Sequence, residues 1–306
     1  MDFKILGKQI KNRAGKLLGH PDMLGIYIKS HRGDGSLLWE YSRKSKACGV
    51  EKRYFILSFD CDTLGDIKVA GEITDRLFEM GITPVMAVPG ELLLRGQDAY
   101  RSIFEKGAEF LNHGYKTHSV KTARGYDSTY DYKDVSFEEV REDVTKGDAT
   151  LRDVLGAEPT GFRTPHFGNF QKKRQLAFLY GVLKKLGYTV STSTIPYFGL
   201  TKGAAYRAGE LLEVPISGMA SEPLRIFDSF FYFDGERDAL RAQDYRREGF
   251  AMAEAFEKHV ENGIINIYAD PSQVYGNEEF FEVMQAFSRV AENTTYSNLA
   301  KEISEK

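Results

Sequence analysis

Reactive side chains follow several apolar segments of the sequence. The segment YFILSFDCDTLGD ends a run of large apolar residues in Asp60 and Asp62, and NHGYKTH contains His113 and His118. A carboxylate and two imidazoles can hold a divalent metal and leave a position for water, whose pKa the metal lowers toward about 7. A second carboxylate beside such a site could take a proton from that water. The residue types therefore indicate metal-assisted hydrolysis.

Two further segments carry polar residues at or just after a strand-like run. TGFRTPHFG contains Arg163 and His166, and the apolar run GIINIY is followed by Asp270. In parallel α/β folds, residues at the carboxyl ends of the strands gather at one rim. We therefore expect these distant segments to contribute to one site.

Each candidate also has a structural interpretation. An aspartate after a strand often caps the next helix, and Asp62 or Asp66 could do so. On an α-helix, His113 and His118 would diverge by about 140°, so they can share a metal only if their segment is a loop or a wide turn. Cys61 lies between the two aspartates and is expected to point into the core.

The elements that must position these residues alternate along the chain. Ser136 and Glu139 form a capping box at the start of a helix predicted to end at Gly156. Helical segments separate most of the strand-like runs, which indicates parallel strands joined by crossover helices and favours a (β/α) barrel. The strand-like runs are RYFILSF, ITPVMAVP, AEFLNHG, TGFRTPHFG, YTVSTST, LLEVPIS and GIINIYADP. Three stretches are predicted to be irregular: residues 119–135, 197–210 and 220–247.

Composition narrows the class of protein. The 306 residues carry a net charge of −3, which gives no global indication of nucleic-acid binding. Two cysteines cannot form a disulfide framework, so a reducing compartment is expected. No run of apolar residues reaches the length of a membrane-spanning helix, and we see no secretory signal. We therefore expect a cytoplasmic protein, peripheral at most to the inner face of a membrane.

Charge is distributed unevenly along the chain. Residues 1–50 have a net charge of +6, so the remainder carries −9. We interpret residues 1–49 as a basic helical extension and residues 50–306 as the catalytic barrel. Residues 1–20 alternate apolar and basic side chains, which is typical of a helix that caps its own domain or lies on an anionic membrane.

Taken in order, the motifs SFDCDT, NHGYKTH, TGFRTPHFG and GYTVSTST resemble those of the polysaccharide deacetylases, carbohydrate esterase family four. The resemblance covers about residues 53–290 and implies a distorted (β/α) barrel, here with about seven parallel strands. It matches Asp60 to the catalytic base, and it matches the metal ligands to Asp62, His113 and His118. Arg163 matches the arginine that orients the base.

This sequence departs from the family pattern in two places. The histidine spacing is one residue longer than usual, so the loop must bulge. The last motif has Asp270 or Ala269 where the family's general-acid histidine would be. Asp270 could act as the acid if its pKa is raised, but we expect His166 to be the easier proton donor. Loss of catalysis is a third alternative.

The resemblance implies a zinc-dependent hydrolase that removes an N-acyl group, acetyl in the first instance, from an amino sugar. The expected substrate is a nucleotide-linked or lipid-linked sugar in surface-polysaccharide or glycan-precursor biosynthesis. One alternative is a hydrolase of a formamide or a cyclic amide, which would need the same metal and base. Another is a non-catalytic, metal-containing carbohydrate-binding protein.

Overall fold

The computed structural model describes residues 22–30, 32–122, 125–233 and 242–304. Seven parallel strands form a curled sheet in the spatial order β10-β1-β2-β3-β6-β7-β9, and β8 continues it antiparallel to β9. This is the distorted (β/α) barrel expected from the sequence. The parallel strands are β1 (Arg53–Asp60), β2 (Val85–Val88), β3 (Glu109–Asn112), β6 (Gly161–Phe162), β7 (Val190–Ser191), β9 (Leu211–Glu213) and β10 (Gly263–Ala269). Beside these seven, the sheet contains β8 (Tyr206–Ala208) and β11 (Glu292–Asn293), and β11 pairs in parallel with β1 off the main path.

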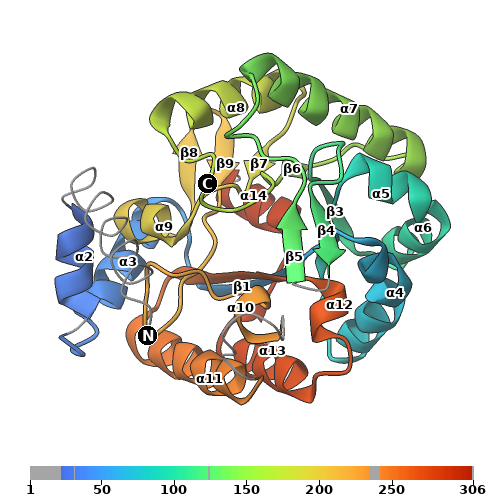
Figure 1. Cartoon of the computed structure of the whole chain (residues 1–306). Helices are drawn as coiled ribbons and strands as arrows, with labels where there is room; N and C mark the ends of the chain where they lie inside the picture. Colours follow the sequence, from blue (N-terminus) through green and yellow to red (C-terminus); the bar gives the residue numbers. More distant parts are fainter. Residues whose placement is uncertain (1–21, 31, 123–124, 234–241, 305–306) are drawn as a thin grey trace, which may run out of the picture.

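Helices surround the strands (Figure 1). In the first half of the chain they are α2 (Asp22–Ser30), α3 (Ser36–Ala47), α4 (Leu64–Glu79), α5 (Gly90–Arg95), α6 (Gln97–Glu105) and α7 (Phe137–Leu155). In the second half they are α8 (Lys173–Lys185), α9 (Pro196–Lys202), α10 (Phe230–Phe233), α11 (Ala242–His259), α12 (Pro271–Val274), α13 (Glu278–Val290) and α14 (Tyr296–Ser304). Because helices cover the outside of the sheet, every residue of β1 after Arg53 is buried.

Local sequence signals account for several boundaries. The backbone N–H of Glu139 donates a hydrogen bond to Ser136 Oγ, so the predicted capping box begins α7. This helix ends at Gly156, which has a φ of 65° and supplies the left-handed C-cap. In α4, Ala70, Ile73 and Leu77 form the buried stripe that packs into the core.

The three stretches predicted to be irregular are more ordered than expected. Residues 119–135 contain a hairpin of β4 (Ser119–Thr122) and β5 (Gly125–Ser128). Residues 197–210 contain β8 and all of α9 after its first residue. The last stretch contains α10 and the beginning of α11. These predictions were wrong because the stretches are rich in turn-forming and polar residues, which do not predict regular structure. The elements found there depend on tertiary contacts that the local sequence does not show.

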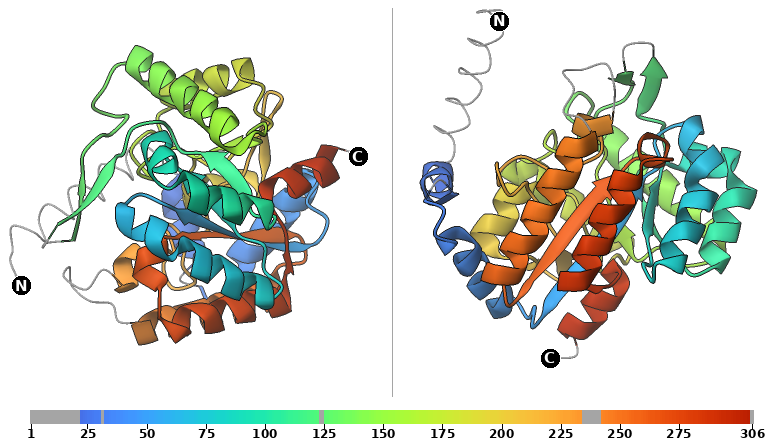
Figure 2. Two further views of the ribbon diagram at one scale, coloured as in Figure 1. Left: turned by 90° about the vertical axis from the view of Figure 1, so that its right-hand side faces the viewer. Right: turned by 90° about the horizontal axis from the view of Figure 1, so that it is seen from below.

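The two ends of the barrel differ. The β4–β5 hairpin projects from one end, and α14 lies at the opposite end (Figure 2). The carboxyl ends of the parallel strands point toward the hairpin. The predicted site residues therefore lie at the hairpin end.

A polar seam joins β10 to the chain that continues from β9. Asn266 Nδ2 donates hydrogen bonds to the carbonyl oxygens of Val214 (3.1 Å) and Pro215 (3.0 Å). The backbone N–H of Ser217 donates to the carbonyl oxygen of Asn266 at 2.7 Å, and Ser217 Oγ accepts from the N–H of Asn266 at 2.9 Å. The side chain of Asn266 thus completes the curled sheet where regular strand pairing stops.

The helical extension expected over residues 1–49 is described from residue 22 onward. Helix α3 packs against β10, and Tyr41 Oη donates a hydrogen bond to the carbonyl oxygen of Ile264 at 2.9 Å. The amphipathic segment predicted for residues 1–20 lies outside the described residues. The domain boundary near residue 50 stays a prediction. No helix in the described part of the chain is both long and apolar enough to cross a membrane.

We predict that Asn266→Leu destabilises the protein, because it leaves the buried carbonyls of Val214 and Pro215 without their donor. Each such group is expected to cost about 1–3 kcal/mol. Urea unfolding measures the change. The matched control is Asn298→Leu at an exposed position of α14, expected to change stability by less than about 0.5 kcal/mol. Equal unfolding midpoints for the two variants would contradict this role of Asn266.

Candidate metal and hydrolytic site

Four strands bring the predicted site residues to one end of the barrel. Asp60 is the last residue of β1, and His113 directly follows β3. Arg163 directly follows β6, and Asp270 directly follows β10. All four side chains are buried. The convergence expected from the sequence is therefore present.

Asp62, His113 and His118 form a compact cluster of possible metal ligands. One ligand atom from each lies within 4.8 Å of the other two. The distance from Asp62 Oδ1 to His118 Nε2 is 2.9 Å, and that from Asp62 Oδ1 to His113 Nε2 is 3.5 Å. All three atoms are buried without a hydrogen-bond partner. Because unpaired buried polar atoms are costly, these convergent donors fit a bound cation.

The ring of His113 is held in the orientation that a metal ligand needs. Its Nδ1 lies 2.8 Å from the carbonyl oxygen of Arg163, so Nδ1–H is the donor and Nε2 keeps its lone pair. The lone pair therefore faces Asp62. A backbone carbonyl on the far nitrogen is a common support for a histidine that binds a metal.

The wide histidine spacing is accommodated by a loop between β3 and β4. Gly114 turns the chain there with a φ of 79°. Asp143 on α7 accepts hydrogen bonds from the N–H of Lys116 (2.9 Å) and from Tyr132 Oη (2.7 Å). A Cβ on Gly147 would lie 2.7 Å from the carbonyl carbon of Gly114, so α7 must carry a glycine at this close approach. Contacts with α7 thus hold the loop in the bulged shape that the histidine spacing requires.

Asp143 and Gly147 were missed from the sequence, although a signal was present. Both lie on the buried face of α7 with Val140 and Val144. An aspartate and a glycine within an apolar stripe indicate a polar partner and a close approach of backbone, respectively. The sequence did not show what the partner would be.

Opposing charges set the ionisation of Asp62. Burial would raise its pKa, but the neighbouring His118, followed by His113, holds that pKa well below its usual range. Asp62 is therefore a carboxylate. Its second oxygen, Oδ2, lies 3.4 Å from Ser119 Oγ at the start of the hairpin.

Asp60 forms a buried ion pair with Arg163. Nη1 of Arg163 donates to Asp60 Oδ1 at 2.6 Å, while Asp60 Oδ2 lies 3.9 Å from His113 Nε2. Nη2 donates to Ser58 Oγ (2.6 Å) and to Tyr296 Oη (2.9 Å). Burial lowers the pKa of Arg163, but the charge of Asp60 raises it above the usual value overall. One carboxylate oxygen is thus fixed by the guanidinium, and the other faces the ligand cluster.

Asp270 lies among carboxylates and is shielded from solvent. Burial, followed by the charges of Asp62, Asp66 and Asp60, raises the pKa of Asp270 well above its usual value. Its backbone N–H donates to Ser229 Oγ at 2.9 Å. This environment favours the protonated acid.

His166 contacts the residues at both ends of the β4–β5 hairpin. Its Nε2 lies 3.1 Å from the carbonyl oxygens of both His118 and Tyr130 and 3.0 Å from Ser128 Oγ. Nε2–H is therefore the donor, and burial together with the charge of His118 lowers the pKa of His166. Its φ of 56° is left-handed, so the backbone is strained at this residue.

The structural alternatives are resolved for three residues. Neither aspartate is the N-cap of α4: Thr63 holds that position, and Asp66 completes the capping box by accepting hydrogen bonds from the N–H and Oγ1 of Thr63 at 2.8 and 2.7 Å. Cys61 is fully buried in the core, as expected. Cys61 and Cys48 are both free thiols.

The hairpin reaches across the site. Tyr126 Oη on β5 lies 3.0 Å from Ser272 Oγ on α12, directly after Asp270. The hairpin therefore connects the His118 side of the site to the Asp270 side. Tyr126 and Ser272 were not identified from the sequence, because residues 119–135 were interpreted as a loop.

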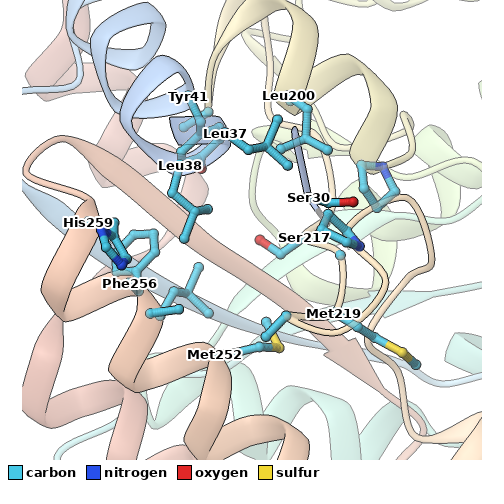
Figure 3. A pocket seen from close by; sticks show the side chains of 18 of the residues that line it. Ser30, Leu37, Leu38, Tyr41, Leu200, Ser217, Met219, Met252, Phe256 and His259 are labelled. Atoms are coloured by element: carbon cyan, nitrogen blue, oxygen red, sulfur yellow. The ribbon is translucent and has the colours of Figure 1, made fainter. Parts of the chain in front are cut away.

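A cavity lies away from these residues. It has a volume of about 240 Å³ and separates Leu37 and Tyr41 on α3 from Met252 and Phe256 on α11 (Figure 3). Ile264, in the amino-terminal half of β10, forms part of its wall. None of the predicted site residues lines this cavity. Its lining is mostly apolar and offers no hydrolytic group beside a metal cluster.

Comparison with known proteins supports the fold and the family. Residues 49–191 match the model of the polysaccharide deacetylase family. No curated protein sequence matches the chain. The family model thus confirms the resemblance expected from the sequence motifs over residues 49–191.

Solved structures share this fold at low sequence identity. A probable polysaccharide deacetylase from Pseudomonas aeruginosa PAO1 aligns with a TM-score of 0.62 at 10% identity, covering 84% of this chain and 93% of that one. The Puue allantoinase aligns with a TM-score of 0.60 at 11% identity, covering 84% and 92%. A candidate polysaccharide deacetylase from Mycobacterium smegmatis aligns with a TM-score of 0.58 at 16% identity, covering 84% of this chain and 91% of that one.

We predict that the protein binds one divalent metal ion through Asp62, His113 and His118. His118→Ala should weaken Zn²⁺ binding at least tenfold, because it removes one of three ligands. Isothermal titration and metal analysis after dialysis measure the effect. His259→Ala is the matched control, since His259 lines the apolar cavity. Equal Zn²⁺ affinity in the two variants would place the metal elsewhere.

Proposed function

From the premise that residues 49–191 belong to the polysaccharide deacetylase family, we propose that this chain is a metal-dependent hydrolase. It removes an N-acyl group, acetyl in the first instance, from an amino sugar. The proposal rests on one observation. The unpaired ligand atoms of Asp62, His113 and His118 lie beside the carboxylate of Asp60, and the buried Arg163 holds one oxygen of that carboxylate.

Asp62, His113 and His118 would hold the metal, and two nitrogens with one oxygen favour zinc. When bound, the metal supplies Lewis-acid polarisation of the scissile carbonyl and of the attacking water. The protein supplies the remaining parts of the reaction. These are a base, a proton donor for the leaving nitrogen, and the walls that orient the sugar.

Asp60 is the proposed general base. Its Oδ1 accepts from Arg163, which leaves Oδ2 directed toward the ligand cluster. A water attacking from that side would give its proton to Oδ2. Arg163 remains charged throughout, so it holds the carboxylate in place before and after proton transfer.

Asp270 is the proposed general acid, the reverse of the preference drawn from the sequence. Nε2–H of His166 is directed at two backbone carbonyls, and burial lowers the pKa of His166, so a proton donated from Nε2 would break contacts that support the hairpin. Asp270 has a raised pKa and shares the rim with Asp60 and Asp62. A protonated carboxyl there can deliver its proton to the leaving amine.

Aromatic side chains support a sugar substrate. Phe167 and Tyr268 lie with ring centroids 5.0 Å apart, and both rings are within 6 Å of the Arg163 guanidinium carbon. Both are partly exposed, so part of each apolar ring could contact a pyranose ring. We propose a nucleotide-linked or lipid-linked amino sugar in surface-glycan synthesis as the substrate. The negative net charge gives no support for a nucleic-acid partner.

We predict that the zinc-loaded enzyme deacetylates an N-acetylated amino sugar and that Asp60→Asn abolishes this turnover. The amide keeps the shape of the side chain but cannot accept the proton, so the rate should fall about 10²–10⁴-fold. Mass spectrometry of nucleotide-linked and lipid-linked N-acetyl sugars measures the product. Bound zinc, measured on the same samples, should be unchanged.

The same panel tests the other interpretations. It includes formamides and cyclic amides, because metal and base would serve these substrates equally well. If a formamide or a cyclic amide is hydrolysed faster than every N-acetyl sugar, that compound class is the substrate instead. Zinc binding with no hydrolysis of any compound would favour a carbohydrate-binding protein. A near wild-type rate for Asp60→Asn would remove Asp60 from the role of base.

We predict that Asp270→Asn slows hydrolysis of an ordinary amide much more than hydrolysis of a substrate with an activated leaving group. An activated group departs without a proton, so loss of the acid matters less for it. His166→Gln is the comparison, because glutamine can still donate to the carbonyls of His118 and Tyr130. If His166→Gln shows this substrate-dependent rescue and Asp270→Asn does not, His166 is the acid.

A further inference from the structure

The first two helices of the described residues, α2 and α3, expose large apolar side chains. On α2, Leu24 is 52% exposed, Tyr27 56% and Ile28 48%. On α3, Trp39 is 71% exposed, the highest value among the large apolar side chains in the described part of the chain. Exposed apolar groups concentrated on neighbouring elements mark an interaction surface more often than scattered ones do. We refer to these four residues as the outer apolar surface.

The outer apolar surface is separate from the face that packs on the barrel. Leu37 and Tyr41 on α3 are buried, and Tyr41 is hydrogen-bonded to β10. On α2, Ile26 is the buried residue. Each helix thus has one apolar face that packs on the protein and additional apolar residues that face solvent. Fold stability does not account for the second set.

The surroundings of Trp39 are basic. Arg43 and Lys46 are exposed on α3, and the 3.6-residue repeat places them within about 60° of Trp39 around the helix axis. Glu40, the one acidic residue of α3, is ion-paired with both Lys29 and Lys44. The exposed charge next to Trp39 is therefore positive, which complements an anionic partner.

We propose that the outer apolar surface docks on an anionic lipid bilayer. A tryptophan flanked by basic residues suits the interface between lipid headgroups and acyl chains, because the ring is amphipathic and the cations attract anionic headgroups. Leucine and isoleucine side chains add apolar area that a nucleic acid would not bury. Residues 1–20, directly before α2, have the same apolar and basic composition and lie outside the described residues. Docking is independent of the proposed hydrolysis.

Trp39 is the only tryptophan in the sequence, so it reports on its own environment. The full-length protein is mixed with vesicles of phosphatidylcholine, with or without phosphatidylglycerol. We expect the protein to float with the anionic vesicles only, with a blue shift of the Trp39 emission and quenching by brominated acyl chains. Affinity should fall about fivefold for each basic residue removed in Arg43→Ser and Lys46→Ser, and raised salt should weaken binding.

Leu24→Ser combined with Ile28→Ser should also weaken flotation, and both positions are exposed enough to preserve the fold. The matched control is Leu94→Ser on α5, which is also exposed and lies outside this surface. Flotation without a change in Trp39 emission, or flotation lost only on deletion of residues 1–20, would overturn the proposal. A concentration-dependent blue shift without vesicles would instead identify a second copy of the chain as the occupant.

Discussion

The buried guanidinium of Arg163 connects the candidate site to the barrel beneath it. A fully buried arginine is stable only if charge and hydrogen bonds compensate its desolvation. Asp60 supplies the charge, while Ser58 and Tyr296 accept hydrogen bonds. Tyr296 in turn donates to Asn266 Oδ1 at 2.7 Å, and Asn266 completes the barrel seam. The position of the proposed base therefore depends on contacts that reach from the seam through the barrel interior.

A second set of contacts fixes the histidines independently of Arg163's side chain. The loop between β3 and β4 takes its shape from Asp143 and Gly147 on α7, and Asn112 Oδ1 accepts from the N–H of Gly114 at 2.9 Å. Only the backbone of Arg163 enters this set, through its carbonyl contact with His113. The ligand cluster and the base are thus supported by different elements. A substitution in one support should leave the other largely in place.

The sequence allowed the fold to be predicted where periodicity was strong. The buried strand before Asp60 and the capping box at Ser136 each follow from local physical rules, and both are present. The hairpin after His118 was missed because four-residue strands depend on contacts such as that of Tyr126 with Ser272. Strand ends also indicated which side chains would meet. The tautomer of His166 and the pKa of Asp270 depend on surrounding atoms from several elements, so no local pattern could reveal them.

The charge balance at the rim explains how two aspartates can stand at the end of a buried strand. Asp60 is neutralised by Arg163, and Asp66 is occupied in capping α4. Asp62 remains a carboxylate that faces two imidazoles without a hydrogen-bond donor for its Oδ1. A cation placed among these atoms would satisfy all three ligands and reduce the repulsion that Asp60 and Asp62 exert on Asp270. A bound cation would therefore lower the proton affinity of Asp270. In the proposed mechanism Asp62 would bind the ion and Asp60 would accept a proton, while the charges of both act on the pKa of Asp270.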